Sequence, residues 1–298
     1  MSYIHAGQSA NGQPVNLYYQ DWGPGNAHST VVLIHGWPLS HEMFEYQMTE
    51  LPKHDIRCVA YDRRGFGKSS KPWEGYDYDT LADDLKALLD GLDLQDVTLV
   101  GFSMGGGEIA RYMSRHRGAR VRSVVFIGAV TPVMLKSDSH ADGIERGVFD
   151  EMIEGIKKDR ADFLHGFGRN FFGVNFISHP VSDSALQYYQ MLAMLASPKA
   201  TIECVRSFSE TDFRQDLTTI SVPALVIHGD ADQIVPFEIS GQRTHQAIPN
   251  AQIVVYEGAP HGLFFTHKEK LTNDLAAFIQ ANATASGQSY GIVGRSSQ

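Results

Sequence analysis

Six short runs of β-branched and aliphatic residues recur along the chain and constrain its fold more than any other feature. Each run is bounded by Gly, Pro or Asp and is mostly apolar, which is typical of a strand buried on both faces of a parallel sheet. Helical patterns lie between several of the runs, and strands that alternate with helices predict a doubly wound α/β fold with a mostly parallel sheet. The runs are residues 31–34, 57–61, 97–100, 121–127, 224–227 and 252–256.

Two of the predicted helices carry start signals. Asp79 is a suitable N-cap for a helix whose leucines recur at helical spacing between positions 81 and 92. Near the end of the chain, Thr266 and Glu269 match a capping box that precedes apolar positions between 271 and 279. We therefore expect one helix to cover a face of the sheet and another to close the fold.

The alternation stops between Thr131 and Thr219, where no buried strand is evident. Apolar residues recur there at helical spacing. The segment also has more aromatic residues than its helices need for packing against the rest of the protein. We predict that 131–219 forms a helical lid over an apolar cavity, inserted into a core made of 1–130 and 220–282 and followed by a polar tail at 283–298. The aromatic residues are Phe163, Phe167, Phe171, Phe172, Phe176, Phe208 and Phe213.

One pentapeptide is placed where it could carry chemistry. Gly101-Phe102-Ser103-Met104-Gly105 is a G-x-S-x-G sequence that directly follows the strand at 97–100 and precedes a helical pattern. A tight turn from strand to helix holds the serine in a strained backbone conformation, and glycine at the flanking positions lets neighbouring chain pack closely. We predict that Ser103 is a nucleophile at a helix N-terminus, where the amides favour negative charge.

A serine hydroxyl is a weak nucleophile at neutral pH, so it needs a base and a carboxylate that orients the base. Both are expected on loops after later strands. His261 follows the last predicted strand, and Asp230 and Asp232 follow the one before it. An Asp directly after His-Gly can turn its loop by bonding local amides, whereas Asp232 is better placed to reach His261, so we favour Asp232. We expect His228 to support the end of its strand.

The same chemistry needs two N–H donors for the oxyanion of the intermediate. The amide of Met104, just after the nucleophile, is the first candidate. The loop after the strand at 31–34 supplies the second, which we assign to Trp37. Pro38 has no N–H to donate, and it biases Trp37 toward an extended backbone.

Charge and cysteine usage exclude several classes of protein. Lys and Arg number 25 against 34 Asp and Glu, a net charge of −9, which argues against a nucleic-acid partner. Cys58 and Cys204 form no CxxC pair and are expected to be reduced core thiols. The N-terminal residues show no signal-peptide pattern, and no apolar run is long enough for a membrane span. We therefore expect a cytoplasmic location and no membrane partner.

Three fragments of binding motifs are incomplete, so no cofactor and no metal is expected. Gly67-Lys68-Ser69 lacks the first glycine of a phosphate loop. Gly65-Phe66-Gly67 begins a dinucleotide fingerprint, but Ser70 stands where the third glycine is needed. His41-Glu42 begins a zinc-protease motif, but Glu45 occupies the position of the second histidine.

Six stretches between about residues 30 and 280 carry a resemblance to a known family. They are HGWPLSHEMFEYQM at 35–48, YDRRGFGKSS at 61–70, GFSMGGGEIARY at 101–112, SFSETDFRQDL at 207–217, HGDADQIVPFE at 228–238 and APHG at 259–262. On these residues the sequence resembles the α/β-hydrolase superfamily and, more narrowly, the bacterial cofactor-free (non-haem) haloperoxidase and aryl esterase group.

The resemblance implies a catalytic triad of Ser103, His261 and Asp232, and an oxyanion hole formed by the amides of Trp37 and Met104. It also implies a buried acyl pocket beneath the lid. We assign to that pocket Trp37, Val130, Phe208, Ile234 and Phe237.

Members of this group hydrolyse esters and some lactones through an acyl-serine. Many of them also let hydrogen peroxide replace water, which converts a carboxylic acid into a peracid that oxidises bromide or chloride without haem or metal. Pro38 resembles the peroxide-using branch, in which a loop carbonyl accepts a hydrogen bond from the peroxide.

We therefore expect a serine carboxylesterase that acts on small esters or aryl esters and has perhydrolase activity. Its partners are then small molecules, an ester or a carboxylic acid with peroxide, and a homo-oligomer is compatible with the sequence. The alternatives are cofactor-free haloperoxidase activity as the main biological role, and lactonase or amidase activity. Epoxide hydrolases and haloalkane dehalogenases resemble the chain in fold, but they have Asp where this chain has Ser103. A ligand-binding protein with vestigial catalysis is disfavoured by the complete set of parts.

Overall fold

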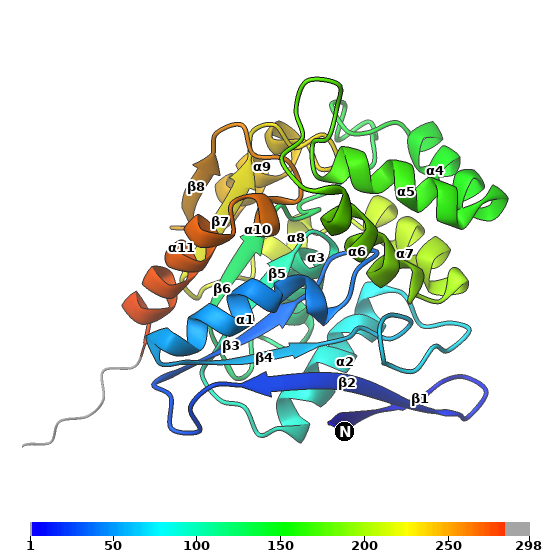
Figure 1. Cartoon of the computed structure of the whole chain (residues 1–298). Helices are drawn as coiled ribbons and strands as arrows, with labels where there is room; N and C mark the ends of the chain where they lie inside the picture. Colours follow the sequence, from blue (N-terminus) through cyan, green and yellow to red (C-terminus); the bar gives the residue numbers. More distant parts are fainter. Residues whose placement is uncertain (1, 284–298) are drawn as a thin grey trace, which may run out of the picture.

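The computed structural model describes residues 2–283, so the predicted polar tail at 283–298 lies outside the described residues except for Ala283. Within this part of the chain, eight strands form one sheet in the order β1-β2-β4-β3-β5-β6-β7-β8 (Figure 1). The strands from β3 to β8 pair in parallel, and β2 joins β4 in an antiparallel manner. The predicted fold class, α/β with a mostly parallel sheet, is confirmed.

Strands β3 to β8 are the six apolar runs of the sequence, and their observed ends lie within two residues of the predicted ones. The strands β5 and β7 are buried throughout, and β3 is buried from Val31 onward, because helices cover both faces of the sheet. The strands are β3 (Ser29–Ile34), β4 (Ile56–Tyr61), β5 (Val97–Phe102), β6 (Val121–Ile127), β7 (Ala224–Gly229) and β8 (Gln252–Tyr256).

The first two strands, β1 (Tyr3–Gln8) and β2 (Pro14–Trp22), were not predicted. They form an antiparallel hairpin at the edge of the sheet. The sequence does contain a signal for it, because Asn11-Gly12 is a favoured hairpin-turn dipeptide and Gly12 has a φ of +78°. An alternating pattern follows, in which Val15 and Leu17 are buried.

Helices lie on both faces of the sheet. In Figure 1, α1 (Glu45–Glu50) and α11 (Lys268–Ala281) lie in front of the strands, and α2 (Tyr78–Gly91) lies behind them. The helix α2 packs against α3 (Met104–Arg115), which begins directly after Ser103. The shorter helices are η1 (His41–Phe44), η2 (Leu51–His54), η3 (Phe237–Ile239), α9 (Gly241–Ala247) and α10 (Leu263–Thr266).

Both predicted helix caps are wrong in detail. The helix α2 is capped by Asp77, whose carboxylate accepts the N–H of Thr80 at 3.0 Å, while Asp79 lies inside the first turn. The capping box of Thr266 and Glu269 does not form, because Thr266 ends α10 and α11 starts at Lys268 without a side-chain cap. In both places the helix begins within two residues of the predicted start.

The segment between β6 and β7 is helical. It contains α4 (Arg146–Lys158), α5 (Arg160–Phe171), α6 (Asp183–Met194), α7 (Pro198–Glu210) and α8 (Arg214–Leu217). The first four of these helices gather at the upper right of Figure 1, beyond the carboxyl ends of the parallel strands. None of the helices in residues 2–283 is long and apolar enough to cross a membrane.

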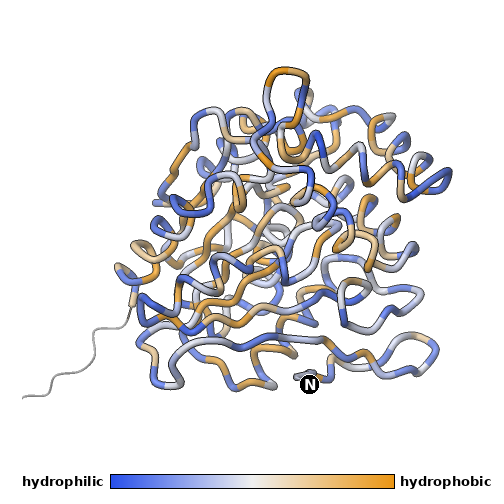
Figure 2. Tube along the Cα trace, in the orientation of Figure 1, coloured by the Kyte–Doolittle hydropathy of each residue, from blue (hydrophilic) through white to orange (hydrophobic). Residues whose placement is uncertain are grey.

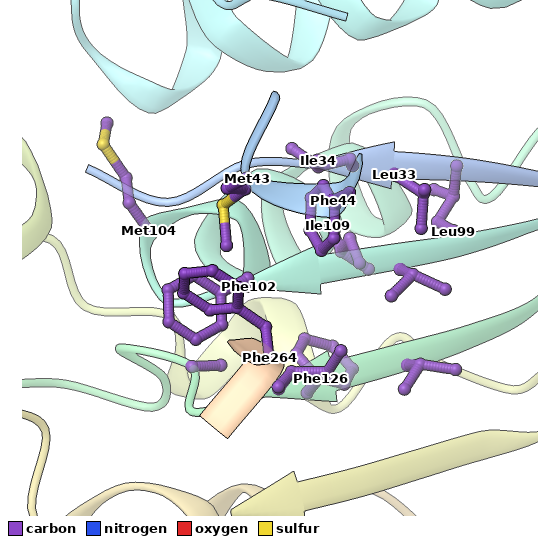
Figure 3. Packing of buried hydrophobic residues seen from close by; sticks show 14 of the residues in the cluster. Leu33, Ile34, Met43, Phe44, Leu99, Phe102, Met104, Ile109, Phe126 and Phe264 are labelled. Atoms are coloured by element: carbon purple, nitrogen blue, oxygen red, sulfur yellow. The ribbon is translucent and has the colours of Figure 1, made fainter. Parts of the chain in front are cut away.

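The core is centred on β3, β5 and β6, where Leu33, Leu99 and Phe126 are completely buried (Figure 3). Apolar segments follow these strands through the middle of the molecule, and polar residues gather on the outer turns (Figure 2). At the end of β5, the ring of Phe102 meets Phe264 edge to face, with centroids 5.1 Å apart. This packing fixes the backbone immediately before Ser103.

The two cysteines are free and buried, as predicted. Burial raises the pKa of each thiol to about 12, so both stay protonated at neutral pH. They therefore contribute packing to the core.

Candidate active site

Ser103 occupies the sharp turn between β5 and α3 that the pentapeptide predicts. Its φ of 54° lies in the left-handed region that non-glycine residues rarely adopt. Two glycines make this turn possible. A Cβ atom on Gly101 would lie 2.5 Å from the carbonyl oxygen of Gly105, and one on Gly105 would lie 2.5 Å from the carbonyl oxygen of Ile34. Helix α3 therefore begins in direct contact with the end of β3.

His261 reaches Ser103 from the loop between β8 and α10. Its Nε2 lies 3.0 Å from the Ser103 hydroxyl oxygen. The imidazole is buried between two phenyl rings, with centroid distances of 4.8 Å to Phe102 and 4.9 Å to Phe171. These contacts hold the ring in the plane that it needs to accept the serine proton.

Asp232 lies on the far side of the imidazole. Its Oδ2 accepts the Nδ1–H of His261 at 2.6 Å, and its Oδ1 accepts the backbone N–H groups of Ile234 and Val235 at 2.9 and 2.8 Å. Burial raises the pKa of Asp232, but the contacts with His261 and His228 lower it more, so the pKa lies well below its ordinary value. The carboxylate is therefore ionised and accepts the Nδ1–H of His261, whose Nε2 faces the serine.

The structure also distinguishes the two aspartates that the sequence offers. The exposed Asp230 accepts the N–H of Gly258 at 2.6 Å and thereby ties the β7 loop to the β8 loop. It makes no contact with His261. His228 supports the site from the end of β7, since its Nε2 lies 2.8 Å from the carbonyl oxygen of Val235 and 3.4 Å from Oδ2 of Asp232.

Of the two predicted oxyanion donors, Met104 is the first residue of α3 and Trp37 lies on the loop after β3. A Cβ atom on Gly36 would lie 3.1 Å from the Ser103 Cβ, so the loop that carries Trp37 runs directly against the serine. Within the described residues, the amides of Trp37 and Met104 have no hydrogen-bond acceptor. The indole of Trp37 is anchored separately, because its Nε1 donates to the carbonyl of Thr201 at 2.9 Å.

A cavity of about 520 Å³ opens beside Ser103 and His261. Four of the five predicted pocket residues line it: Trp37, Val130, Phe208 and Ile234. Phe237 does not, because η3 turns its ring toward His228, with centroids 5.7 Å apart. Of the aromatic residues predicted to cover the cavity, Phe163, Phe167 and Phe208 line it. The sequence analysis did not assign the other apolar residues of 131–219 that line it, which are Met134, Ile144, Val148, Phe149 and Met152.

The cavity is apolar apart from a few groups. Asp162 and Asn170 are exposed residues on α5, and Gln233 stands beside Asp232 on the β7 loop. No Lys or Arg is among the lining residues that the structure describes. An uncharged substrate with an apolar acyl or aryl group fits this environment better than an anionic one.

One group of side chains within residues 2–283 has the spacing of metal ligands, namely His41, Glu42 and Asp62. Its acceptors are already in use. Asp62 accepts the backbone N–H groups of His41 and Lys68 at 2.9 and 2.8 Å, and the Lys68 ammonium lies 3.2 Å from Glu42. We therefore interpret this group as a structural network of the loop after β4.

Comparisons with known proteins agree with this geometry. A family described as the alpha/beta hydrolase fold matches residues 29–268. A non-heme chloroperoxidase from Kitasatospora aureofaciens is 43% identical over 267 residues, which is 89% of this chain and 96% of the relative. A bifunctional esterase/perhydrolase from Acinetobacter calcoaceticus is 39% identical over 90% of this chain and 97% of its own.

The solved structures lead to the same family. A bromoperoxidase from Bacillus anthracis superimposes with a TM-score of 0.89 and 46% sequence identity, over 94% of this chain and 99% of its own. The predicted relationship is therefore confirmed. The chain belongs to the α/β-hydrolase family and, within it, to the group of non-haem haloperoxidases.

Proposed function

We propose that this protein is a serine carboxylesterase for small or aryl esters that forms an acyl-serine at Ser103 and also transfers the acyl group to hydrogen peroxide. The observation that carries this proposal is the unbroken series of hydrogen bonds from Ser103 through His261 to Asp232 at the edge of an apolar cavity. The names of the relatives, which include esterase, perhydrolase and chloroperoxidase, support it.

Acylation begins when the Ser103 oxygen attacks the ester carbonyl carbon and His261 Nε2 takes the hydroxyl proton. The amides of Trp37 and Met104 donate to the oxygen that becomes negative. Collapse of this intermediate breaks the bond to the alcohol, which leaves with the proton that His261 held. The acyl group is then bound to Ser103 as an ester.

Asp232 takes no proton in these steps. Its carboxylate keeps the Nδ1–H tautomer of His261 and stabilises the imidazolium that forms when the serine is deprotonated. The hydrogen bonds from Ile234 and Val235 hold the carboxylate in place, so the imidazole stays aligned with Ser103 through the cycle.

Deacylation uses the same base with a second nucleophile. His261 removes a proton from water or from hydrogen peroxide, whose oxygen attacks the acyl carbon and releases Ser103. Water yields a carboxylic acid, and peroxide yields a peracid. The peracid oxidises a halide ion to hypohalous acid in solution and is itself reduced to the carboxylic acid, so haloperoxidase activity follows from perhydrolysis.

The helices of 131–219 serve in this proposal as the lid of the site, with 1–130 and 220–282 as the hydrolase core. Residues of this segment supply most of the apolar lining. They would shield the apolar part of the acyl group from solvent and set the size of substrate that the cavity accepts.

A substrate panel tests the proposal. The wild-type protein and Ser103→Ala are assayed on p-nitrophenyl esters, on a lactone and on acetate with hydrogen peroxide, after thermal melts have shown that both proteins fold. We expect ester hydrolysis and peracid formation in the wild type and neither in the variant. Ester hydrolysis without any peracid would contradict the perhydrolase part, and activity that survives in Ser103→Ala would contradict the whole proposal.

A further inference from the structure

We infer that Arg63 and Glu108 form a buried clamp that sets the distance between the two oxyanion donors, Trp37 and Met104. The inference rests on the proposed function, since it assigns a positioning role to residues that do not touch the substrate. It concerns a charge network below the floor of the site that links the loop after β3 to helix α3.

The clamp is an ion pair inside the core. The side chains of Arg63 and Glu108 are each 1% exposed, and both Nε and Nη2 of Arg63 contact Oε1 of Glu108. The hydroxyl of Tyr61 donates to the other carboxylate oxygen at 2.6 Å. Such a pair contributes little to stability, because the desolvation of two buried charges offsets most of their attraction. Its contacts with neighbouring segments are therefore the better guide to its role.

On one side, Arg63 holds the backbone that leads into Trp37. Its Nη2 donates to the carbonyl of His35 at 2.6 Å, and its backbone N–H donates to Nε2 of His35 at 2.9 Å. The Nδ1–H of His35 in turn donates to the carbonyl of Gly36 at 2.9 Å. Two successive carbonyls before Trp37 are thus fixed by one guanidinium and one imidazole.

This arrangement requires a neutral His35 in a single tautomer. Nε2 must accept the N–H of Arg63, so the ring proton must be on Nδ1. Burial, followed by the charge of Arg63, holds the pKa of His35 well below its ordinary value, which keeps the ring neutral. The loop is consequently held in one geometry over the neutral pH range.

On the other side, Glu108 holds the helix that carries Met104. Glu108 lies about one helical turn after Met104 in α3. The hydroxyl of Tyr78 donates to the carbonyl of Met104 at 3.2 Å and supports the same turn. Figure 3 shows Ile109 of this helix near Ile34 of β3, while Met104 lies on the far side of Met43. A shift of Glu108 relative to Arg63 therefore moves one donor amide relative to the other.

Oxyanion donors stabilise the transition state only within hydrogen-bond distance of the developing charge, so small displacements of one amide lower the rate. A loosened clamp should weaken binding of the tetrahedral oxyanion while leaving binding of an uncharged ligand in the cavity nearly unchanged. Substitution of a residue that only stabilises the core should change the affinity for the oxyanion and the affinity for the uncharged ligand to the same extent.

The chain contains a matched control for this distinction. Arg64 and Asp84 form a neighbouring buried ion pair, with Nε and Nη2 of Arg64 each 2.6 Å from a carboxylate oxygen of Asp84. This pair ties the loop after β4 to α2 and makes no hydrogen bond to residues 35–37. The substitution Asp84→Asn should therefore disturb the fold as much as Glu108→Gln without moving either donor.

The experiment compares wild type, Glu108→Gln and Asp84→Asn in the full-length protein. The readouts are the melting temperature, kcat and KM on p-nitrophenyl acetate, and two inhibition constants. The first inhibitor is phenylboronic acid, which forms a tetrahedral anion on a serine. The second is benzyl alcohol, which binds as an uncharged ligand. In Glu108→Gln we expect kcat and boronate affinity to fall together by about 10- to 100-fold, with KM and benzyl alcohol affinity within about twofold. In Asp84→Asn we expect only the melting temperature to fall.

A milder variant covers the case in which Glu108→Gln does not fold. Tyr61→Phe removes one hydrogen bond to Glu108 and keeps the ion pair, so we expect a loss of roughly threefold to tenfold in boronate affinity with an unchanged KM. Equal effects of the Glu108 and Asp84 substitutions on boronate affinity, or no effect of Tyr61→Phe, would overturn the clamp alone. A wild-type protein that does not bind phenylboronic acid would overturn the proposed function together with the clamp.

Discussion

Oδ2 of Asp232 lies 2.6 Å from Nδ1 of His261, whereas the carboxylate of Asp230, two positions earlier, accepts the backbone N–H of Gly258. The two aspartates follow the same strand and differ in what their carboxylates reach. Asp232 is buried and holds the imidazole, while Asp230 is exposed and joins two loops. This difference gives a direct way to separate a catalytic carboxylate from a structural one.

The substitution Asp232→Asn should lower kcat by about 10⁴-fold, because the amide favours the wrong tautomer of His261 and does not stabilise its cation. Asp230→Asn is the matched control and should stay within about threefold of wild type. Steady-state kinetics on one p-nitrophenyl ester measure both. Comparable losses in the two variants would argue against the assignment of Asp232.

The pH dependence of stability reports on the same carboxylate. Burial raises the pKa of Asp232, but His261 and His228 lower it more, so the folded pKa lies below the value of about 3.9 in an unfolded chain. The contribution of Asp232 to the free energy of unfolding is therefore complete above about pH 4 and is lost as the pH falls toward the folded pKa. The difference in unfolding free energy between wild type and Asp232→Asn should therefore stay constant down to about pH 4 and shrink between about pH 4 and about pH 3. Denaturant titrations at several pH values measure it, and a difference that grows on acidification contradicts the prediction.

The turn at Ser103 should tolerate no side chain at Gly105. Its Cβ would lie 2.5 Å from the backbone oxygen of Ile34, so Gly105→Ala should cost about 1–3 kcal/mol of unfolding free energy and most of the activity. Gly168→Ala in α5, where nothing lies within 4 Å of the new Cβ, should leave stability unchanged or raise it by up to about 1 kcal/mol. Chemical denaturation measures both changes, and an unperturbed Gly105→Ala protein would refute the strained turn.

The lining of the cavity predicts a change in specificity. Phe208→Ala removes a ring from the cavity wall and should raise the ratio of kcat/KM for a hexanoate ester over an acetate ester by about 10-fold or more. Phe237→Ala removes a ring that lies outside the cavity and should leave this ratio unchanged, even if the variant is less stable. The opposite pattern would mean that acyl groups bind elsewhere.

The sequence predicted those parts of the molecule whose signals are local. Strands β3 to β8 are mostly apolar runs, and the glycines of the pentapeptide indicate a turn in which backbone segments pack closely. Trp37, Val130, Phe208 and Ile234 were assigned to the cavity through the family resemblance. Phe237 was wrongly assigned to the cavity. Its direction depends on how η3 turns, and that turn follows a loop held by the bonds from the amides of Ile234 and Val235 to Asp232, which a single sequence does not reveal.

The parts that were missed depend on contacts between distant residues. Arg63 and Glu108 meet only after β4 and α3 have packed, and no spacing pattern connects them. The N-cap of α2 is Asp77 and not the predicted Asp79. The carboxylate of Asp79 pairs instead with Arg111 and Arg115 on the adjacent helix α3. The hairpin β1-β2 is the exception, since its Asn-Gly turn is a local signal in the sequence.

The central claim is that the acyl group of the substrate is carried by Ser103. Rapid quenching of the protein during turnover of p-nitrophenyl acetate, followed by peptide mass spectrometry, tests this claim most directly. The account predicts an acetyl group on the peptide that contains Ser103, and its release as peracetic acid when hydrogen peroxide is added. An active protein that carries no acetyl group at Ser103, or carries it on another residue, would contradict the account.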